Sequence, residues 1–548
     1  MTINYLNNDY TIDLKAKTEN QGRNTSQVKF EVSASIEHIE TRTNINQNFY
    51  TQSMNTYNKQ TTSGENTEAY VFFGRSVAIV NSSKILIGAP HKNHTGHTGT
   101  PGDVGSVFEY TFTPGVTDSK GSQWVEKVEI SGNLSLMDTQ KRMYFGTALA
   151  ATGSYVAVGA PGLDGEPGNQ ASNNGAVFIF KSSSSGYTEE DLFRPADTSS
   201  NAQYFGSVLT FDRNSNRLAV NGQNMENVYI FSSSSLGWER EAILTSSLIT
   251  YNSSDFGHSL ALSGTYLAVG APLSRQDSFL DEGSVSIFKS SSSGWSEIVN
   301  VTSSNPVARG YFGLSLSILS NKRIVVGEPQ GHPSVNKTGS VAIISFDDSG
   351  GKTILQTIEN PRDNNYGSFG RNISSYEDGE FIIISRPLTN DNGTDSGNAE
   401  GHRALFVYQL SGSNNWSLSG TLTRDQSLAT YYASTPGDWF YGSDYAKTGF
   451  HVPLDAKDGV VLLGVEDATD NTFRSDSPFN YSLGEFRAWR TLVTSSISIE
   501  EVTYDSTVVG ETTVANFVPF RFHQNGPVNL RSQSNSKGYE TFLGDQKS

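Results

Sequence analysis

Three histidines stand close enough together in the chain to bind a metal ion. His91, His94 and His97 are spaced three residues apart, in a segment that also contains Gly96 and Gly99. Imidazoles clustered in this way can coordinate a transition metal. However, no carboxylate is adjacent to orient the rings, and the glycines allow the segment many conformations. The two interpretations are a metal site and a polar surface loop.

Two acidic segments carry the oxygen ligands that Ca²⁺ prefers. The first, DNGTD, begins at Asp391 and ends at Asp395, and the second, EDATD, spans 466–470. Carboxylates at alternating positions can converge on one hard cation. Each segment is therefore either a calcium site or a solvated acidic turn.

Two segments resemble catalytic motifs only superficially. GHSLA at 257–261 is similar to the turn that carries the nucleophilic serine of hydrolases. The corresponding segments of sister repeats read GRSVA at 74–78 and GLSLS at 313–317, so the pattern belongs to a repeat. SGGKT at 349–353 is similar to the end of a phosphate-binding loop, but Phe346 stands where its first glycine is required. We expect this second segment to be a turn between two strands. We also expect that the protein is not an enzyme.

The composition favours many short strands and excludes several classes of protein. Hydrophobic residues make up 35% and charged residues 17% of the 548 residues, and the net charge is −17. Abundant Gly and β-branched residues disfavour long helices. An acidic surface repels phosphate groups, which argues against nucleic acid as a partner. With no cysteine, disulfides and thiolate chemistry are excluded.

The sequence also lacks the signals of membrane insertion. No apolar run approaches the roughly 20 residues that a membrane-spanning helix needs. Residues 1–9 lack the basic and apolar regions of a secretory signal peptide.

A repeat dominates the middle of the chain. Each strong copy has a Phe-Gly pair, then an apolar run that ends in Gly-Ala-Pro or a close variant, then a Gly-Ser-Val or Gly-Ala-Val run. Three further copies are degenerate, and Gly442 marks the weakest. The repeat residues are Phe73, Gly74, Gly88 and Pro90; Phe145, Gly146, Gly159 and Pro161; Phe205 and Gly206; Phe256, Gly257, Gly270 and Pro272; Phe312, Gly313, Gly327 and Pro329; and Phe369 and Gly370.

The spacing of the copies predicts the fold. Successive Phe-Gly glycines lie 72, 60, 51, 56, 57 and 72 residues apart, if Gly442 is the seventh. Each copy holds three short apolar runs and a fourth run, which in several copies opens with tryptophan (Trp124, Trp238, Trp295 and Trp416). Four strands per repeat of this length are typical of a propeller blade. We therefore predict an all-β, seven-bladed β-propeller of four-stranded antiparallel blades; an array of β-sandwiches is the alternative.

The residue types of the repeat fit this architecture. Phenylalanine can fill the layer between blades, and the following glycine can turn without a Cβ clash. We expect the run that ends in Gly-Ala-Pro to be an inner strand near the central channel, where small residues fit. Proline ends that strand because it cannot donate a hydrogen bond to the ladder.

Over residues 69–495 these motifs resemble FG-GAP repeats, as in integrin α-subunit head domains and many bacterial and viral surface proteins. The resemblance implies a β-propeller that binds other molecules. Many such blades bind Ca²⁺ between the Phe-Gly strand and the Gly-Ala-Pro strand, in a loop of the type Asp-x-Asp/Asn-x-Asp-Gly. Here the corresponding positions, 81–83, 151–154 and 263–265, hold too few carboxylates. We therefore expect no cofactor, with Ca²⁺ as the alternative.

The flanks are expected to carry further strands. Residues 1–68 form an N-terminal extension, in which the alternating segment 27–36 is expected to close the ring by pairing with the last blade. Residues 496–548 form a C-terminal extension with β segments and a polar tail.

The loops indicate a function in binding. Segments 91–104, 162–174, 273–282, 330–338 and 388–403 occupy equivalent repeat positions, differ in length, and should therefore lie on one rim. Divergent loops on a constant scaffold suit recognition of a protein or a glycan.

We therefore predict a non-enzymatic binding or adhesion protein that does not insert into membranes. The Ser/Thr/Asn/Gly-rich composition is similar to that of phage and virus structural or attachment proteins, which predicts a virion component with other virion proteins as partners. The alternatives are a secreted or cell-surface adhesin, a carbohydrate-active enzyme on a propeller, and a structural spacer.

Overall fold

The structure is a computed structural model, and its described part consists of β-strands and connecting segments without an α-helix. Among these residues, no helix has the length and apolar character needed to cross a bilayer. The described residues are 2–5, 8–20, 26–35, 50–56, 72–92, 103–112, 124–132, 142–165, 173–183, 186–196, 202–212, 216–223, 225–247, 254–275, 281–320, 322–329, 339–361, 368–376, 379–386, 404–422, 453–465, 485–491, 507–509, 512–514, 520–523, 527–535 and 538–545.

Seven four-stranded antiparallel sheets follow one another along the chain, and each is one blade. Blade 1 contains β5 (Ser76–Asn81), β6 (Lys84–Ala89), β7 (Ser106–Phe112) and β8 (Trp124–Ile130). Blade 2 contains β9 (Leu149–Ala151), β10 (Tyr155–Ala160), β11 (Ala176–Ser183) and β12 (Gly186–Phe193). Blade 3 contains β13 (Phe205–Phe211), β14 (Arg217–Gly222), β15 (Val228–Ser234) and β16 (Gly237–Leu244).

The next three blades repeat this order. Blade 4 contains β17 (Ser259–Ser263), β18 (Tyr266–Ala271), β19 (Ser284–Ser291) and β20 (Gly294–Thr302). Blade 5 contains β21 (Leu316–Leu319), β22 (Arg323–Glu328), β23 (Ser340–Phe346) and β24 (Lys352–Glu359). Blade 6 contains β25 (Ile373–Tyr376), β26 (Phe381–Arg386), β27 (Ala404–Leu410) and β28 (Trp416–Leu422).

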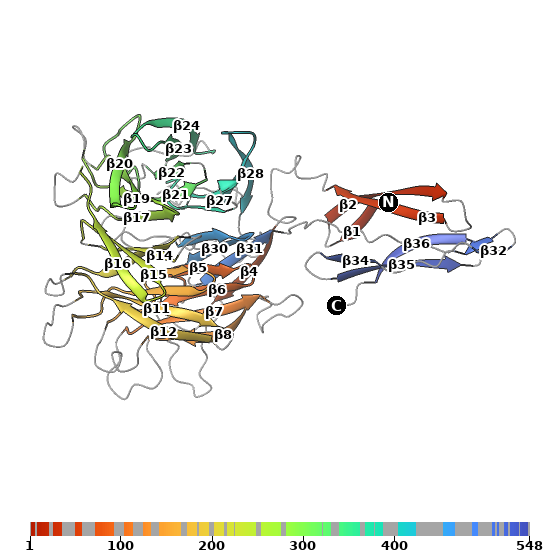
Figure 1. Cartoon of the computed structure of the whole chain (residues 1–548), viewed down its shortest axis with the longest axis horizontal. Helices are drawn as coiled ribbons and strands as arrows, with labels where there is room; N and C mark the ends of the chain where they lie inside the picture. The colour runs from red at the N-terminus through yellow and green to blue at the C-terminus, as the bar shows by residue number, and fades with distance from the viewer. Residues whose placement is uncertain are drawn as a thin grey trace, which may run out of the picture. The chain divides into compact units, whose positions relative to one another are not determined.

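The blades form a closed ring, which confirms the predicted seven-bladed propeller. The first strand of each blade contacts the first strand of the next, in the order β5, β9, β13, β17, β21, β25, β29 (Leu454–Lys457) and back to β5. The fourth strands, such as β8, β12, β20 and β24, lie at the periphery of the propeller in Figure 1. The strand nearest the axis is thus the one that follows Phe-Gly, and the Gly-Ala-Pro strand is second from the axis.

The seventh blade combines strands from both ends of the chain. Its order is β29, β30 (Val460–Val465), β31 (Glu485–Thr491) and then β4 (Tyr50–Thr56). The N-terminal region therefore supplies the outer strand that completes the ring. The segment that does so is β4; the expected segment 27–36 instead contains β3 (Ser26–Ser35), which pairs with β2 (Asn8–Asn20).

Phenylalanines of the Phe-Gly pairs fill the layer between blades. Phe73 is fully buried, and its ring lies 5.8 Å from Phe108 in its own blade and 6.2 Å from Phe486 in blade 7. Ser76, two residues beyond Gly74, donates a 2.7 Å hydrogen bond to the backbone oxygen of Gly146 in blade 2. Ser259 and Ser315 make the same 2.7 Å bond to the next blade. Apolar packing and repeated hydrogen bonds thus join neighbouring blades.

Residues 1–51 and 491–548, with 114–116, form one compact unit, and residues 52–113 and 117–490 form another. The first unit holds a sheet of β1 (Thr2–Tyr5), β2 and β3. It also holds a pair, β32 (Thr507–Val509) and β33 (Thr512–Val514), and a sheet of β34 (Phe520–His523), β35 (Pro527–Asn535) and β36 (Gly538–Asp545). The two terminal segments thus belong to the same unit.

Candidate functional site

The start of each first strand lies beside the end of the second strand. Backbone hydrogen bonds join Gly74 N to Gly88 O (2.9 Å), Gly146 N to Gly159 O (3.0 Å) and Gly313 N to Gly327 O (3.0 Å). The residue before each Phe-Gly pair therefore lies at the same end of its blade as the connection that follows Gly-Ala-Pro. Because the blades repeat one topology around a closed ring, these positions share one face, which we call the collar face.

Aromatic residues precede the Phe-Gly pair in four blades. Phe72, Tyr144, Tyr204 and Tyr311 are all partly exposed, and we call them the aromatic collar. Their φ angles are 52°, 55°, 51° and 55°. Positive φ is uncommon for bulky residues, so the surrounding structure must hold these backbones in place.

The backbone of the preceding blade provides that support. Tyr144 N donates to Asp103 O (3.1 Å), Tyr204 N to Asn173 O (3.0 Å) and Tyr311 N to Asp281 O (3.1 Å). In each case the acceptor lies just before the third strand of the preceding blade. The contacts between neighbouring blades therefore also hold the backbones of these three tyrosines in place.

One cluster of contacts on the collar face surrounds His91. Its ring lies 4.5 Å from Phe72 and 4.8 Å from Tyr144, and its Nδ1 lies 3.3 Å from Asp103 Oδ1. Burial lowers the pKa of His91 below its ordinary value, although Asp103 opposes this shift. Burial, followed by the charge of Asp103, raises the pKa of Tyr144. Both aromatic groups are thus stabilised in their uncharged forms.

A second part of the collar face combines an aromatic ring with charges of both signs. Burial is the main cause that raises the pKa of Tyr311, and Asp281 adds to it while Arg309 and Arg371 oppose it. Arg275 Nε lies 3.9 Å from Asp281 Oδ1. Aromatic, carboxylate and guanidinium groups together can pack against an apolar ligand surface and hydrogen-bond its polar groups.

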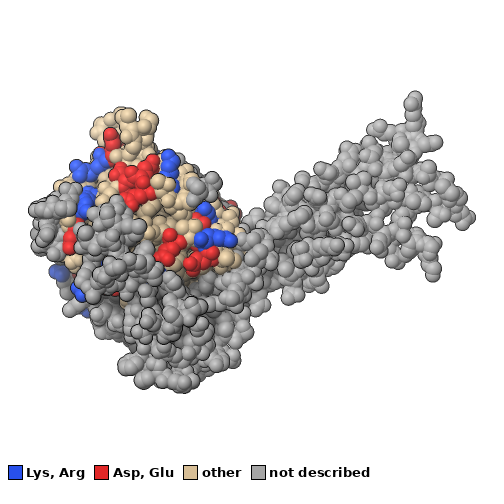
Figure 2. Space-filling model, turned by 90° about the horizontal axis from the view of Figure 1, so that it is seen from below, with Lys and Arg blue, Asp and Glu red and all other residues tan. Residues whose placement is uncertain are grey.

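Charges are mixed on the described part of the surface that Figure 2 shows. Figure 2 shows Asp and Glu side chains gathered in patches, with Lys and Arg side chains between and beside them. The described residues seen in Figure 2 form no extended basic patch of the kind that binds a phosphate backbone.

The structure describes only part of the predicted metal-ligand residues. His91 belongs to the collar face, where Asp103 orients its ring, although that carboxylate is not adjacent in sequence. His94, His97, Asp391 and Asp395 lie outside the described residues. Among the described residues, no group of three or more His, Asp or Glu side chains could hold a metal ion.

The two segments that resemble catalytic motifs have structural roles. Ser259 donates its hydrogen bond across the blade boundary to Gly313, as its counterparts do, which confirms that GHSLA belongs to the repeat. Asp347 Oδ1 accepts hydrogen bonds from Ser349 N (2.8 Å) and Gly351 N (2.9 Å) between β23 and β24. The second segment is therefore a turn, as predicted.

The aromatic collar is absent from the residues that sequence reasoning singled out. Its signal is visible in the sequence: an aromatic residue precedes Phe-Gly in four copies, at positions 72, 144, 204 and 311. The buried phenylalanines and glycines define the repeat because they carry the fold. The position beside them varies among blades, with a partly exposed Asp255 in blade 4 and a buried Ser368 in blade 6, and therefore stands out less.

Several solved structures are similar to the chain at low identity. A protein from Lactobacillus plantarum is 12% identical, with a TM-score of 0.39, and the match covers 75% of this chain and 99% of that one. A putative 6-phosphogluconolactonase from Bacteroides fragilis is 11% identical, with a TM-score of 0.38, covering 68% and 93%. The β-propeller domain of Cps50 (Swd1) from Myceliophteria thermophila is 10% identical, with a TM-score of 0.42, covering 80% and 99%.

No curated protein sequence matches this chain. The model of the FG-GAP repeat family matches residues 131–180, which begin after the last strand of blade 1 and include β9, β10 and most of β11 in blade 2. The same Phe-Gly and Gly-Ala-Pro positions recur in the other blades and carry the contacts of the ring. The chain therefore contains an FG-GAP repeat at residues 131–180, and it folds as a seven-bladed β-propeller, which is consistent with a propeller of the integrin-α-like type.

Proposed function

We propose that the protein is a non-enzymatic binding protein whose collar face recognises a protein or a glycan. The observation that carries this proposal is the aromatic collar, in which four blades present a partly exposed aromatic side chain at one repeat position. Tyrosines on rigid backbones are well suited to recognition, since they offer a large contact area and lose little conformational freedom on binding.

The groups around the collar favour binding over catalysis. Burial lowers the pKa of the His91 imidazole below its ordinary value, and Nδ1 of this ring faces Asp103. Ser259, the serine of the hydrolase-like segment, is hydrogen-bonded within the ring at 7% exposure. These residues contribute shape and hydrogen-bonding capacity to the face and its scaffold.

We further propose that the protein is a virion component that takes part in host attachment. The terminal segments form a compact unit separate from the propeller, which supports a division between attachment to a particle and ligand recognition. The Ser/Thr/Asn/Gly-rich, cysteine-free composition also supports this proposal. A location in a virion or outside the cell follows from it, and a secreted or cell-surface adhesin would use the collar face in the same way.

Two experiments test these proposals. Mass spectrometry of purified particles should detect the protein together with other virion proteins, and its absence from particles would favour the adhesin. Binding of the purified chain to intact cells and to a glycan array, run beside a reducing-sugar release assay, should give binding without turnover. Release of sugar would instead identify a carbohydrate-active enzyme.

A further inference from the structure

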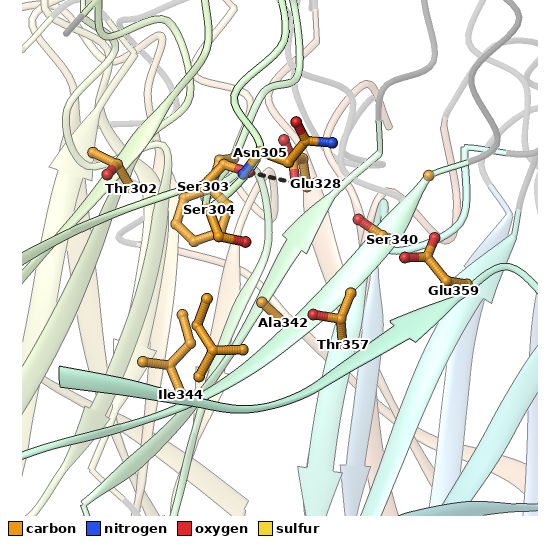
Figure 3. Close-up of a pocket in the computed structure, with 13 residues that line it drawn as sticks. Thr302, Ser303, Ser304, Asn305, Glu328, Ser340, Ala342, Ile344, Thr357 and Glu359 are labelled. Atoms are coloured by element: carbon orange, nitrogen blue, oxygen red, sulfur yellow. Dashed lines mark hydrogen bonds between the residues drawn. The ribbon is translucent and has the colours of Figure 1, made fainter.

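A pocket of about 320 Å³ lies beside blade 5 (Figure 3). One wall is formed by β23 and β24, and the opposite side by the segment that leaves β20 at Thr302 and by Phe312. Its volume is at the small end of the roughly 300–1,000 Å³ that small-molecule sites occupy. The pocket can therefore hold a ligand the size of a single sugar ring.

Strand register divides the pocket wall into a polar and an apolar part. Ser340 pairs with Glu328 on one side and with Glu359 on the other, so these three side chains form a row across β22, β23 and β24. Further along the same face, Ile344 pairs with Ile354. Since directly paired residues project from the same face of a sheet, polar groups line one end and aliphatic groups the other.

Glu328 is the unusual residue of this row. The other strong repeats have an alanine at the corresponding position, namely Ala89, Ala160 and Ala271. The Glu328 residue is only 7% exposed. Its Oε2 accepts a 3.0 Å hydrogen bond from Ser303 Oγ, drawn in Figure 3. Burying a carboxylate costs free energy that burying an alanine does not, so this blade departs from its sister blades at an energetic cost.

The chemistry of the lining selects one class of ligand. None of the residues that line the pocket is basic. The polar side chains carry hydroxyls, one amide and two carboxylates, and they belong to Thr302, Ser303, Ser304, Ser340 and Thr357, to Asn305, and to Glu328 and Glu359. Carboxylates accept strong hydrogen bonds from hydroxyl groups and repel anions. Ile354, at 41% exposure, offers an apolar surface to a ligand.

We propose that this pocket binds a single non-anionic sugar residue of a glycan. The apolar face of the sugar ring packs against Ile354, and its hydroxyls donate to Glu328 and Glu359. This inference rests on the proposed binding function and specifies the class of ligand for one site. It also excludes sialylated, sulfated and phosphorylated residues from this pocket.

The test is binding of methyl glycosides to the full chain, measured by saturation-transfer NMR and calorimetry. The probes are glucose, galactose, mannose, fucose and N-acetylglucosamine, with glucuronic acid and N-acetylneuraminic acid as anionic counterparts. We expect saturable binding of at least one neutral sugar and none of the anionic ones. Binding of none of the neutral sugars, or equal binding of the anionic ones, would overturn the proposal.

Two variants locate the site. Glu328→Ala introduces the residue of the sister blades and should leave the thermal midpoint unchanged while weakening sugar binding about tenfold or more. Glu359→Gln should weaken binding less, because the amide oxygen still accepts a hydrogen bond. The matched control is Glu239→Ala, an exposed carboxylate of β16 in blade 3, which should bind sugar as the wild type does.

Two further outcomes would count against a sugar in this pocket. Sugar binding that both Glu328→Ala and Glu359→Gln leave unchanged would place the ligand elsewhere and overturn the inference. Calcium binding that Glu328→Ala abolishes, without sugar binding, would replace the sugar by a cation. If the wild type binds cells through the collar face but no sugar binds, only this inference fails; if it binds neither, the proposed function fails as well.

Discussion

The backbone oxygen of Gly146 in blade 2 lies so close to the α-carbon of Gly88 in blade 1 that a Cβ added to Gly88 would be 2.2 Å from it. The same relationship joins Gly159 to Gly206, Gly270 to Gly313, Gly327 to Gly370, and Gly464 to Gly74. The glycine of Gly-Ala-Pro is thus required by the carbonyl of the next Phe-Gly pair. The two halves of the repeat signature meet across the blade boundary.

Replacement of one of these glycines should destabilise the propeller. In Gly270→Ala the added Cβ would be 2.1 Å from the backbone oxygen of Gly313, so blades 4 and 5 must move apart. We expect a loss of about 1–3 kcal/mol, measured as a lower unfolding midpoint in heat and urea. Gly153→Ala is the control, because its added Cβ would have no atom within 4 Å. Equal midpoints for the two variants would contradict the packing described above.

The degenerate third repeat should depend on an asparagine instead of a glycine. Asn221 stands at the glycine position, and its Nδ2 donates a 2.7 Å hydrogen bond to the backbone oxygen of Phe256 in blade 4. Asn221→Asp replaces this donor with an acceptor that faces a carbonyl, and should lower the free energy of unfolding by about 1–3 kcal/mol. Urea titration measures the effect. An aspartate variant as stable as the wild type would show that this hydrogen bond does not join the blades.

Removal of β4 should open the ring. A chain that lacks residues 1–56 leaves the edge of β31 unpaired, whereas one that lacks residues 1–49 retains β4 (Tyr50–Thr56). An exposed strand edge promotes pairing with other chains. We expect the shorter chain to aggregate and to unfold at a lower temperature than the longer one, by light scattering and calorimetry. Identical behaviour of the two truncations would argue against closure by β4.

Stability should depend on pH through His91. Burial holds its pKa in the folded protein below the value in the unfolded chain, so the unfolded chain binds the proton first as the pH falls. This contribution to stability is complete above the unfolded pKa of about 6.5 and declines below it. The urea midpoint of the wild type should therefore fall more than that of His91→Gln when the pH is lowered from neutral to about 5.5. The same fall in both would remove His91 as the cause.

The sequence predicts the ring because its residues repeat, and it cannot predict contacts that arise once. Phe145, Gly146 and Gly159 recur since every blade boundary needs the same packing. The outer strand β4 reads YTQSMNT, and this polar sequence carries no apolar alternation, so pattern alone favours the more regular segment 27–36 for ring closure. A peripheral strand buries little, and hydrophobic pattern therefore identifies it poorly.

The contacts that form the candidate sites are harder to predict from the sequence than the fold is. His91 and Asp103 are twelve residues apart and meet only because Gly105 N bonds to the backbone oxygen of Lys92 and brings the ends of this connection together. Glu328 stands out in the sequence as a departure from Gly-Ala-Pro. The sequence does not show that Ser303, in the connection between blades 4 and 5, donates a hydrogen bond to it. Such partners become visible only when the blades are placed side by side.

The most direct test of the proposed function is binding of the purified chain to intact host cells or to its immobilised ligand, with and without the collar tyrosines. A variant that combines Tyr144→Ala, Tyr204→Ala and Tyr311→Ala should keep the wild-type thermal midpoint and bind about 30-fold more weakly or worse, since even one anchor residue of an interface contributes about 2 kcal/mol. Leu236→Ala, which removes an 88% exposed side chain at the turn between β15 and β16, should bind normally. Full affinity in the triple variant would show that the collar face is not the binding site.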